Sequence, residues 1–216
     1  MAYTTLFLDL DDTLYPSTNG LWHAIGARMD DYMRARLNLP EDKISTLRKH
    51  YFLEYGTTLR GLQIHYQVDT EDFLDYVHDL PIEQIVSPDP ELYELLSSIP
   101  LPIFIFTNAN RKHATRVLDS LRIMDCITDI IDVTTMNYIS KPNTHAYYTS
   151  LRIAGESNPR ACVYLDDSVR NLVPAHELGF FTILVGSQVQ NPSVRLSINR
   201  PHELKIVMPD LWNNHR

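Results

Sequence analysis

The stretch Leu6-Phe7-Leu8-Asp9-Leu10-Asp11-Asp12-Thr13-Leu14 decides how the rest of this chain is interpreted. Its apolar half is typical of a buried strand, and that strand delivers Asp9 and Asp11 to its C-terminal end. Gathering like charges at one place costs free energy unless a cation or a reaction accounts for it. The stretch therefore predicts a site in which one carboxylate acts as a nucleophile or metal ligand beside a second carboxylate.

Short apolar runs alternate with longer helical patterns in the remainder of the chain. Such alternation is typical of an α/β fold in which a parallel sheet is covered by helices on both faces. The expected strands are Thr4–Leu8, Ile103–Thr107, Ile130–Val133, Cys162–Asp166 and Thr182–Val185, and the expected helices are Pro90–Ser98, Arg111–Leu121, Thr144–Ala154 and Val169–Leu178.

Residues 16–87 interrupt this alternation, because they contain helical patterns and no convincing strand. We expect a helical domain at 16–87, inserted after the first strand, and an α/β core domain formed by 1–15 and 88–216. An insertion directly after the acidic strand end would lie over the site and could act as a lid, although a helical subdomain with its own core gives the same pattern. The helices expected in the insertion are Leu21–Leu37, Asp42–Tyr55, Leu59–Tyr66 and Thr70–Val77. A closing helix and tail are expected over Pro201–Trp212.

Composition narrows the possible partners and locations. The 216 residues carry a net charge of −8 and show no basic stripe, which argues against a nucleic acid polymer as partner. No apolar run reaches the length of a membrane span, and no basic segment followed by an apolar core opens the chain. Cys126 and Cys162 lie in or beside apolar segments, which favours buried free thiols. We expect a cytoplasmic protein without membrane contact, either a monomer or a homodimer.

Polar residues follow several of the predicted strands. In an open parallel sheet, ligands bind beyond the carboxyl ends of the strands, so these residues are expected to meet at one edge. The candidates are Asp9 and Asp11 after the first strand, Thr107 and Asn108 after the second, Asp166 and Asp167 after the fourth, and Lys141 before a helix.

These residue types suit phosphoryl transfer. A carboxylate such as Asp9 can attack phosphorus and divide one difficult step into two. Mg²⁺ prefers oxygen ligands, which Asp9, Asp167 and the backbone carbonyl of Asp11 could supply. Thr107 precedes a helix N-terminus that can cradle phosphate, and Lys141 would neutralise the phosphate charge.

Asp11 is the candidate for proton transfer to the leaving oxygen and then from water. That role requires its pKa to be raised relative to that of Asp9, which crowding by other carboxylates can achieve.

Each signal also has an ordinary explanation when taken alone. Thr107-Asn108 and Asp166-Asp167 could simply cap helices, and the first acidic cluster could be a solvated turn. A calcium-binding loop starting at Asp9 is excluded, because Leu14 stands where the sharp turn needs glycine and Gly20 where a bidentate glutamate belongs. Only the combination, in this order along the chain, favours phosphoryl chemistry.

The combination resembles the haloacid dehalogenase superfamily in its phosphatase branch. That family has Asp-x-Asp-x-Thr after an apolar strand, a Ser or Thr after a second strand, a Lys and an acidic pair after a later strand. Here the matching residues are Asp9-Leu10-Asp11-Asp12-Thr13, Thr107, Lys141 and Asp166-Asp167, in the same order. The resemblance implies a Rossmann-like parallel sheet with strand order 5-4-1-2-3 and a helical C1-type cap. It also implies that Asp9, Asp11, Asp166 and Asp167 surround Mg²⁺.

Four segments further resemble the pyrimidine 5'-nucleotidase group of fungal, plant and bacterial proteins. They are Asp9–Pro16 (DLDDTLYP), Tyr55–Leu62 (YGTTLRGL), Phe106–Ala114 (FTNANRKHA) and Asp166–Asn171 (DDSVRN). This resemblance implies hydrolysis of nucleoside monophosphates such as UMP and CMP. Related phosphatases act on sugar phosphates and lysophospholipid phosphates, and substrate transfers less well between relatives than fold does.

Asp11 separates the two main chemistries within the superfamily. Dehalogenase members lack this second aspartate, because a halide leaves without a proton. An alkoxide leaving group needs that proton, so the presence of Asp11 favours a phosphatase.

The helical insertion offers candidates for substrate contact. Gly56, Thr57 and Thr58, with Gly61, suit a loop that approaches a ligand closely, although Thr57 or Thr58 could equally cap a helix. A base could contact the side chains of His23, Tyr32, His65 and Tyr66, whereas Trp22 is expected to pack within the insertion. The segment Arg111-Lys112-His113 is expected to form a solvated helix face, and Asn171 is expected to orient the metal ligands.

The sequence thus predicts a Mg²⁺-dependent phosphomonoesterase that acts on a small phosphate ester. Asp9, Asp11, Thr107 and Lys141 are the expected catalytic residues. A non-catalytic phosphate-binding module and a phosphotransferase or phosphomutase are the alternatives.

Overall fold

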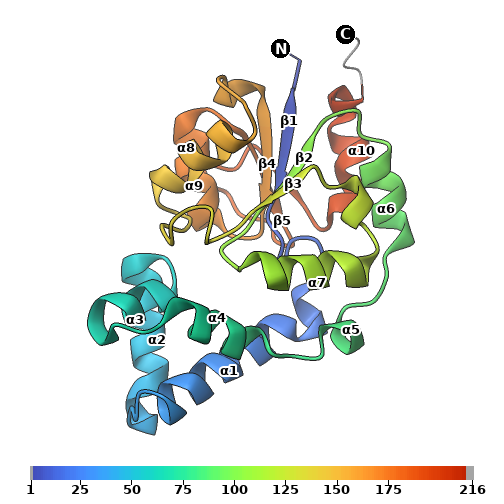
Figure 1. Cartoon of the computed structure of the whole chain (residues 1–216). Coiled ribbons are helices and arrows are strands. Elements are labelled where there is room, and N and C mark those ends of the chain that lie inside the picture. Colours follow the sequence, from blue (N-terminus) through green and yellow to red (C-terminus); the bar gives the residue numbers. More distant parts are fainter. Residues whose placement is uncertain (1, 213–216) are drawn as a thin grey trace.

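The fold is built on one six-stranded sheet, described by a computed structural model that covers residues 2–212 (Figure 1). All neighbouring strands run parallel, in the order β3-β2-β1-β4-β5-β6. The first five strands have the expected order, with β1 at the centre of the sheet. The strands are β1 (Thr5–Leu8), β2 (Ile103–Phe106), β3 (Asp129–Ile131), β4 (Cys162–Asp166), β5 (Phe181–Val185) and β6 (Leu196–Ile198).

Successive side chains of each strand point to opposite faces of the sheet, and each face is covered by helices. Leu6 and Leu8 of β1 pack in the core beneath α6 and α7, whereas Phe7 packs with Phe104 and Tyr164 beneath α8 and α9 (Figure 1). These apolar, continuously buried strands explain why a parallel sheet forms. The covering helices are α6 (Pro90–Ser97), α7 (Arg111–Leu121), α8 (Thr144–Ile153), α9 (Val169–Leu178) and α10 (Leu204–Val207).

The insertion after β1 is helical, as expected. Its helices lie beyond the carboxyl edge of the sheet, where α1 packs against α4 and α2 against α3 (Figure 1). The division into domains at 16–87 stays a prediction, and the outermost core boundaries, residues 1 and 216, lie outside the described residues. The helices of the insertion are α1 (Leu21–Ala35), α2 (Glu41–Tyr55), α3 (Thr58–Tyr66), α4 (Thr70–His78) and α5 (Ile82–Ile85).

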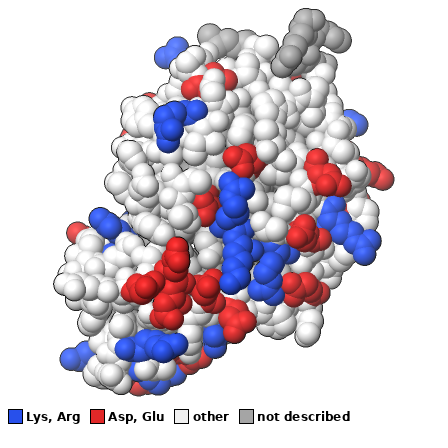
Figure 2. Space-filling view, viewed as in Figure 1, with Lys and Arg blue, Asp and Glu red and all other residues white. Residues whose placement is uncertain are grey.

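Ion pairs also connect the insertion with the core. Lys112 of α7 binds Asp75 of α4 at 2.9 Å, and Arg116 of α7 binds Glu83 of α5 at 3.1 Å. On the face shown in Figure 2, basic side chains lie beside acidic ones. None of the helices in residues 2–212 combines the length and apolar character that crossing a bilayer requires.

Two short elements were not expected. The edge strand β6 and the single turn of α5 contain three or four residues, which are too few for a periodic pattern. The closing segment begins helically, as expected, because the turn Pro201–Glu203 leads directly into α10. Pro209 then opens a separate turn, Pro209–Leu211, since proline cannot continue a helix from the preceding turn.

Candidate active site

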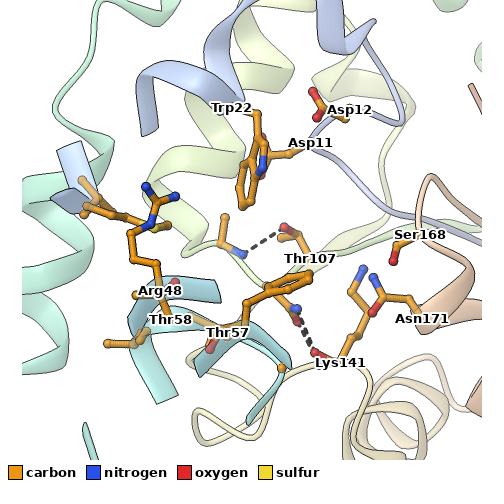
Figure 3. A pocket seen from close by; sticks show the side chains of 18 of the residues that line it. Asp11, Asp12, Trp22, Arg48, Thr57, Thr58, Thr107, Lys141, Ser168 and Asn171 are labelled. Atoms are coloured by element: carbon orange, nitrogen blue, oxygen red, sulfur yellow. Dashed lines mark hydrogen bonds between the residues drawn. The ribbon is translucent and has the colours of Figure 1, made fainter. Parts of the chain in front are cut away.

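The predicted residues meet in a cavity between the carboxyl edge of the sheet and the helical insertion (Figure 3). The cavity has a volume of about 520 Å³, enough for a small organic phosphate. Its core side comes from the ends of β1, β2 and β4 and from the loop that carries Lys141. Residues that line it include Asp9, Asp11, Gly56, Thr57, Thr58, Thr107, Asn108, Lys141 and Asp167.

Lys141 is the buried cation of the site. Its Nζ lies 2.7 Å from Asp9 Oδ1, 2.6 Å from the carbonyl oxygen of Phe106, and 3.0 Å from both Asp166 Oδ2 and the Tyr164 hydroxyl. Burial acts to lower the pKa of Lys141, but the charges of Asp166 and Asp9 outweigh it, so the pKa is raised. Lys141 therefore carries a fixed positive charge beside Asp9.

Thr13 joins Asp9 to the end of β4. Its hydroxyl donates to Asp9 Oδ2 at 3.0 Å and accepts from the backbone N–H of Asp167 at 3.0 Å. Lys141 contacts one carboxylate oxygen of Asp9 and Thr13 contacts the other, so the two residues fix the orientation of this carboxylate. Burial, together with the charges of Asp166 and Asp11, raises the pKa of Asp9 to about 7 against the opposing charge of Lys141.

Three carboxylates gather at this point with more negative charge than Lys141 can balance. Oxygens of Asp9, Asp166 and Asp167 lie within 4.8 Å of one another. Although Asp167 is exposed toward the cavity, desolvation and then repulsion by Asp9 and Asp166 raise its pKa to about 8. An oxygen-rich, charge-crowded site of this kind fits a hard divalent cation such as Mg²⁺.

Asp166 differs from its neighbours because its oxygens already accept several hydrogen bonds. They accept from Lys141, the Tyr164 hydroxyl, the backbone N–H of Ser168 at 2.8 Å and the Asn171 side-chain amide at 3.0 Å. Asn171, which was expected to orient the metal ligands, contacts Asp166, and its role toward a metal stays a prediction. Asp166 in turn holds Lys141 in place.

Asp11 lies beside Asp9, but the expected order of their pKa values was wrong. Burial acts to raise the pKa of Asp11, yet the charge and hydrogen bond of His113 and the hydrogen bond from Tyr15 outweigh it, so the pKa is lowered. His113 Nε2 lies 2.8 Å from Asp11 Oδ1, and the Tyr15 hydroxyl donates to the same oxygen at 2.5 Å. Burial, together with the neighbouring carboxylates, raises the pKa of Asp9 instead.

His113 was expected on a solvated helix face and is instead fully buried beneath the site. The sequence did contain a signal for this position. Val117 and Leu121 follow at intervals of four residues, so the three side chains share the inner face of α7. His78, at the end of α4, stacks on His113 with ring centroids 4.2 Å apart.

Thr107 and Asn108 lie where expected, after β2, and their side chains shape the loops. Thr107 Oγ1 accepts from the backbone N–H of Ala109 at 3.0 Å. The side-chain amide of Asn108 donates to the carbonyl of Lys141 at 3.0 Å and accepts from its N–H at 2.9 Å (Figure 3). The two segments are thereby clamped together around the ammonium group.

The loop of the insertion does approach the core closely. Gly56 has φ +92°, and a Cβ there would lie 3.1 Å from both the Lys141 carbonyl oxygen and Pro142 Cδ. Thr57 caps α3 by accepting from the N–H of Arg60 at 3.1 Å, and both Thr57 and Thr58 line the cavity. Thr57 therefore both caps a helix and lines the cavity, and its contact with a substrate stays a prediction.

The wall of the cavity formed by the insertion is aromatic and cationic. Trp22 and Phe52 line it with 46% and 45% of their surfaces exposed, so Trp22 does not pack inside the insertion as expected. Arg48 donates to Asp30 at 2.8 Å and to the carbonyl of Gly26 at 2.9 Å, and its buried Nε has no hydrogen-bond partner within residues 2–212. Trp22 and Arg48 lie across the cavity from Lys141 and Asn171 (Figure 3).

The other side chains expected to contact a base do not line the cavity. Tyr32 is buried in the insertion, where its hydroxyl donates to Asp72 at 2.9 Å. His65 stacks on Tyr51 instead. The four expected base contacts that lie outside the cavity lining are His23, Tyr32, His65 and Tyr66.

Comparison with known proteins agrees with this geometry. The model of a protein family described as "Hydrolase: haloacid dehalogenase-like hydrolase" matches residues 3–179. A curated relative, "Phosphate metabolism protein 8" of Saccharomyces cerevisiae, is 26% identical over 194 residues. That alignment covers 82% of this chain and 60% of the relative, so this chain spans less than two thirds of the yeast protein.

Solved structures show the same fold at low sequence identity. The HAD-hydrolase YfnB of Bacillus subtilis, bound to magnesium, has a TM-score of 0.65 and 15% identity, with 96% of this chain and 99% of that one covered. A HAD phosphatase of Thermococcus onnurineus has a TM-score of 0.62 and 16% identity, with 94% and 97% covered.

Proposed function

The chain belongs to the haloacid dehalogenase-like hydrolases, and we propose that it is a Mg²⁺-dependent phosphomonoesterase that forms an aspartyl-phosphate on Asp9. The observation that carries the proposal is the position of Asp9 at the cavity, held by Lys141 and Thr13, with Asp11 beside it. Asp11 also favours a phosphatase over a dehalogenase, because only an alkoxide leaving group needs a proton.

In the first half-reaction, a carboxylate oxygen of Asp9 bonds to phosphorus as the bond from phosphorus to the leaving oxygen breaks. Lys141 and the Thr107 segment hold the phosphoryl group. Because the pKa of Asp11 is lowered, its resting carboxylate first takes up a proton from solvent in the cavity and then passes it to the leaving oxygen. In the second half-reaction, Asp11 takes a proton from water, and the water oxygen bonds to phosphorus as the bond to Asp9 breaks. Inorganic phosphate and the free Asp9 carboxylate result.

Asp9, Asp167 and the backbone carbonyl of Asp11 would hold Mg²⁺, and Asp166 would act beside them by fixing Lys141. A bound Mg²⁺ would offset the repulsion between the Asp9 carboxylate and an anionic substrate. The raised pKa values of Asp9 and Asp167 support this assignment, because burial and then repulsion between carboxylates both disfavour their ionised forms in the absence of a cation.

For the substrate we propose pyrimidine nucleoside 5'-monophosphates such as UMP and CMP. Trp22 and Phe52 offer apolar ring faces on which a base can stack, and Arg48 lines the same wall of the cavity. The loop Gly56-Thr57-Thr58 lies between this wall and the phosphate end of the cavity. We further propose a cytoplasmic location and a monomer or homodimer.

A panel of phosphate esters tests both the proposed phosphatase activity and the proposed substrate. UMP, CMP, purine nucleotides, sugar phosphates and lysophospholipid phosphates are incubated with the protein in Mg²⁺ or in EDTA, and phosphate release is measured. We expect Mg²⁺-dependent release that is absent in Asp9→Asn, with kcat/KM for UMP and CMP at least about tenfold above the other classes. No release from any ester would overturn the phosphatase, whereas preference for another class would overturn only the substrate.

The same reactions separate hydrolysis from phosphoryl transfer. With an added sugar or alcohol, a hydrolase releases inorganic phosphate quantitatively. Transfer of most of the phosphate to the added acceptor would indicate a phosphotransferase or phosphomutase instead.

A further inference from the structure

Two side chains, those of His113 and Tyr15, contact the same carboxylate oxygen of Asp11, Oδ1. His113 Nε2 lies 2.8 Å from Asp11 Oδ1, and the Tyr15 hydroxyl donates to Oδ1 at 2.5 Å. His113 is fully buried and the Asp11 side chain is only 12% exposed, so water competes little for these contacts. Both contacts leave Oδ2 as the oxygen that can reach a ligand in the cavity.

We propose that His113, assisted by Tyr15, is a positioning residue that aims Asp11 Oδ2 at the leaving-group oxygen. The inference rests on the proposed phosphatase activity and extends it, because His113 is not among the residues that line the cavity and would act through the Asp11 side chain. Proton transfer requires the donor oxygen within hydrogen-bonding distance of the leaving oxygen, and a free aspartate can rotate away from that position. Fixing Oδ1 removes this freedom.

His78 supports the same arrangement from the insertion. Its ring stacks on that of His113, with centroids 4.2 Å apart and planes inclined by 24°. His78 ends α4, whereas His113 lies in α7, so the stack connects the helical insertion to the residue that holds Asp11. The ring of His113 is therefore constrained on one face by His78 and at its edge by Asp11.

The inference makes a prediction about leaving groups. An alkyl phosphate needs a proton on its departing oxygen, whereas p-nitrophenolate leaves without one. The ratio kcat/KM reports the steps up to departure of the leaving group and excludes later hydrolysis of the aspartyl-phosphate. Loss of His113 should therefore lower kcat/KM for an alkyl ester much more than for p-nitrophenyl phosphate.

The experiment uses the full chain and the best alkyl ester from the substrate panel beside p-nitrophenyl phosphate. His113→Leu keeps most of the buried volume and removes the ring nitrogen, whereas His113→Gln can place an amide N–H near the position of Nε2. His176→Leu, a partly buried histidine of α9 that does not line the cavity, is the matched control. If His113→Leu does not fold, Tyr15→Phe removes the other contact to Oδ1 and is measured in its place.

We expect His113→Leu to lose about 10- to 100-fold more kcat/KM on the alkyl ester than on p-nitrophenyl phosphate. His113→Gln should recover most of this difference, and His176→Leu should show none. In an Asp11→Asn background, His113→Leu should add no further loss on the alkyl ester, because its effect passes through Asp11.

Equal losses on the two esters, or additive losses in the double variant, would overturn the inference. A wild-type protein that releases phosphate from neither ester would instead overturn the proposed function. The two failures are thus distinguishable.

Discussion

Replacing Lys141 with Met removes the buried cation of the site while keeping most of its volume. The substitution leaves Asp9 and Asp166 in the interior without the ammonium group that lies 2.7 and 3.0 Å from them. Removing one partner of a buried ion pair costs about 3–5 kcal/mol, because the remaining charge stays desolvated. For a chain of this size, 1 kcal/mol corresponds to about 2–4 °C, so the melting temperature should fall by roughly 6–20 °C.

The loss should depend on pH in a defined direction. The Lys141 charge lowers the pKa of Asp9 against the larger effect of burial, so its removal raises that pKa further. Protonation of Asp9 then relieves the unpaired charge, and the destabilisation should be largest near pH 8 and smaller near pH 5. Phosphate release should fall by at least about 100-fold, because the phosphoryl group also loses its charged partner.

Thermal denaturation in EDTA at several pH values, with Lys112→Met as control, measures this prediction. Lys112 also pairs with an aspartate at 2.9 Å, but both side chains are more than half exposed. Its loss should cost less than about 1 kcal/mol at every pH. A Lys141→Met protein that melts within 2–3 °C of the control near pH 8, or that loses more stability near pH 5, would refute the reasoning.

Three further predictions follow from the site. Gly56→Ala should lower both stability and kcat/KM, because its Cβ meets the Lys141 carbonyl oxygen at 3.1 Å. Gly155→Ala, at φ +67° with open space around it, should lower stability alone. Equal kcat/KM values for the two variants would contradict this prediction. The pKa values raised to about 7 at Asp9 and about 8 at Asp167 mean that the folded protein binds extra protons. The melting temperature in EDTA should therefore fall as pH rises from about 5 to 8. Added Mg²⁺ should raise the melting temperature more at pH 8 than at pH 5. The same increase with Mg²⁺ at both pH values would count against the metal site. Trp22→Ala should lower kcat/KM for UMP about tenfold or more and leave that for p-nitrophenyl phosphate within about threefold; equal losses would remove Trp22 as a contact of the base.

The sequence was most informative where one local pattern determines the structure. The apolar run before Asp9 is typical of a buried strand, and the carboxyl ends of parallel strands share one edge. The meeting of Asp9, Thr107 and Asp167 follows from those two facts, whereas Lys141 lies in the loop before α8. The strand order required the family resemblance, since β1 lies between β2 and β4, which are distant in sequence.

The residues that surround Asp11 show what local patterns cannot provide. The direction of its pKa shift depends on His113, 102 positions later in the chain, and on the buried hydroxyl of Tyr15. Counting the neighbouring acids in the sequence predicted a raised pKa for Asp11, whereas its pKa is lowered. The two contacts that lower it exist only in the folded chain. Trp22 illustrates the same limit, since a tryptophan on an amphipathic helix can face either a core or a cavity.

The central claim is that Asp9 carries the phosphoryl group during turnover, and trapping that intermediate tests it most directly. The protein is mixed with its best ester in Mg²⁺ and quenched rapidly with acid. The acyl-phosphate is then reduced with borohydride, which converts a phosphorylated aspartate to homoserine, and peptides are analysed by mass spectrometry. We predict homoserine at position 9 alone, and none in Asp9→Asn. Homoserine at another aspartate, or turnover by the Asp9→Asn protein at a rate near that of the wild type, would contradict the account.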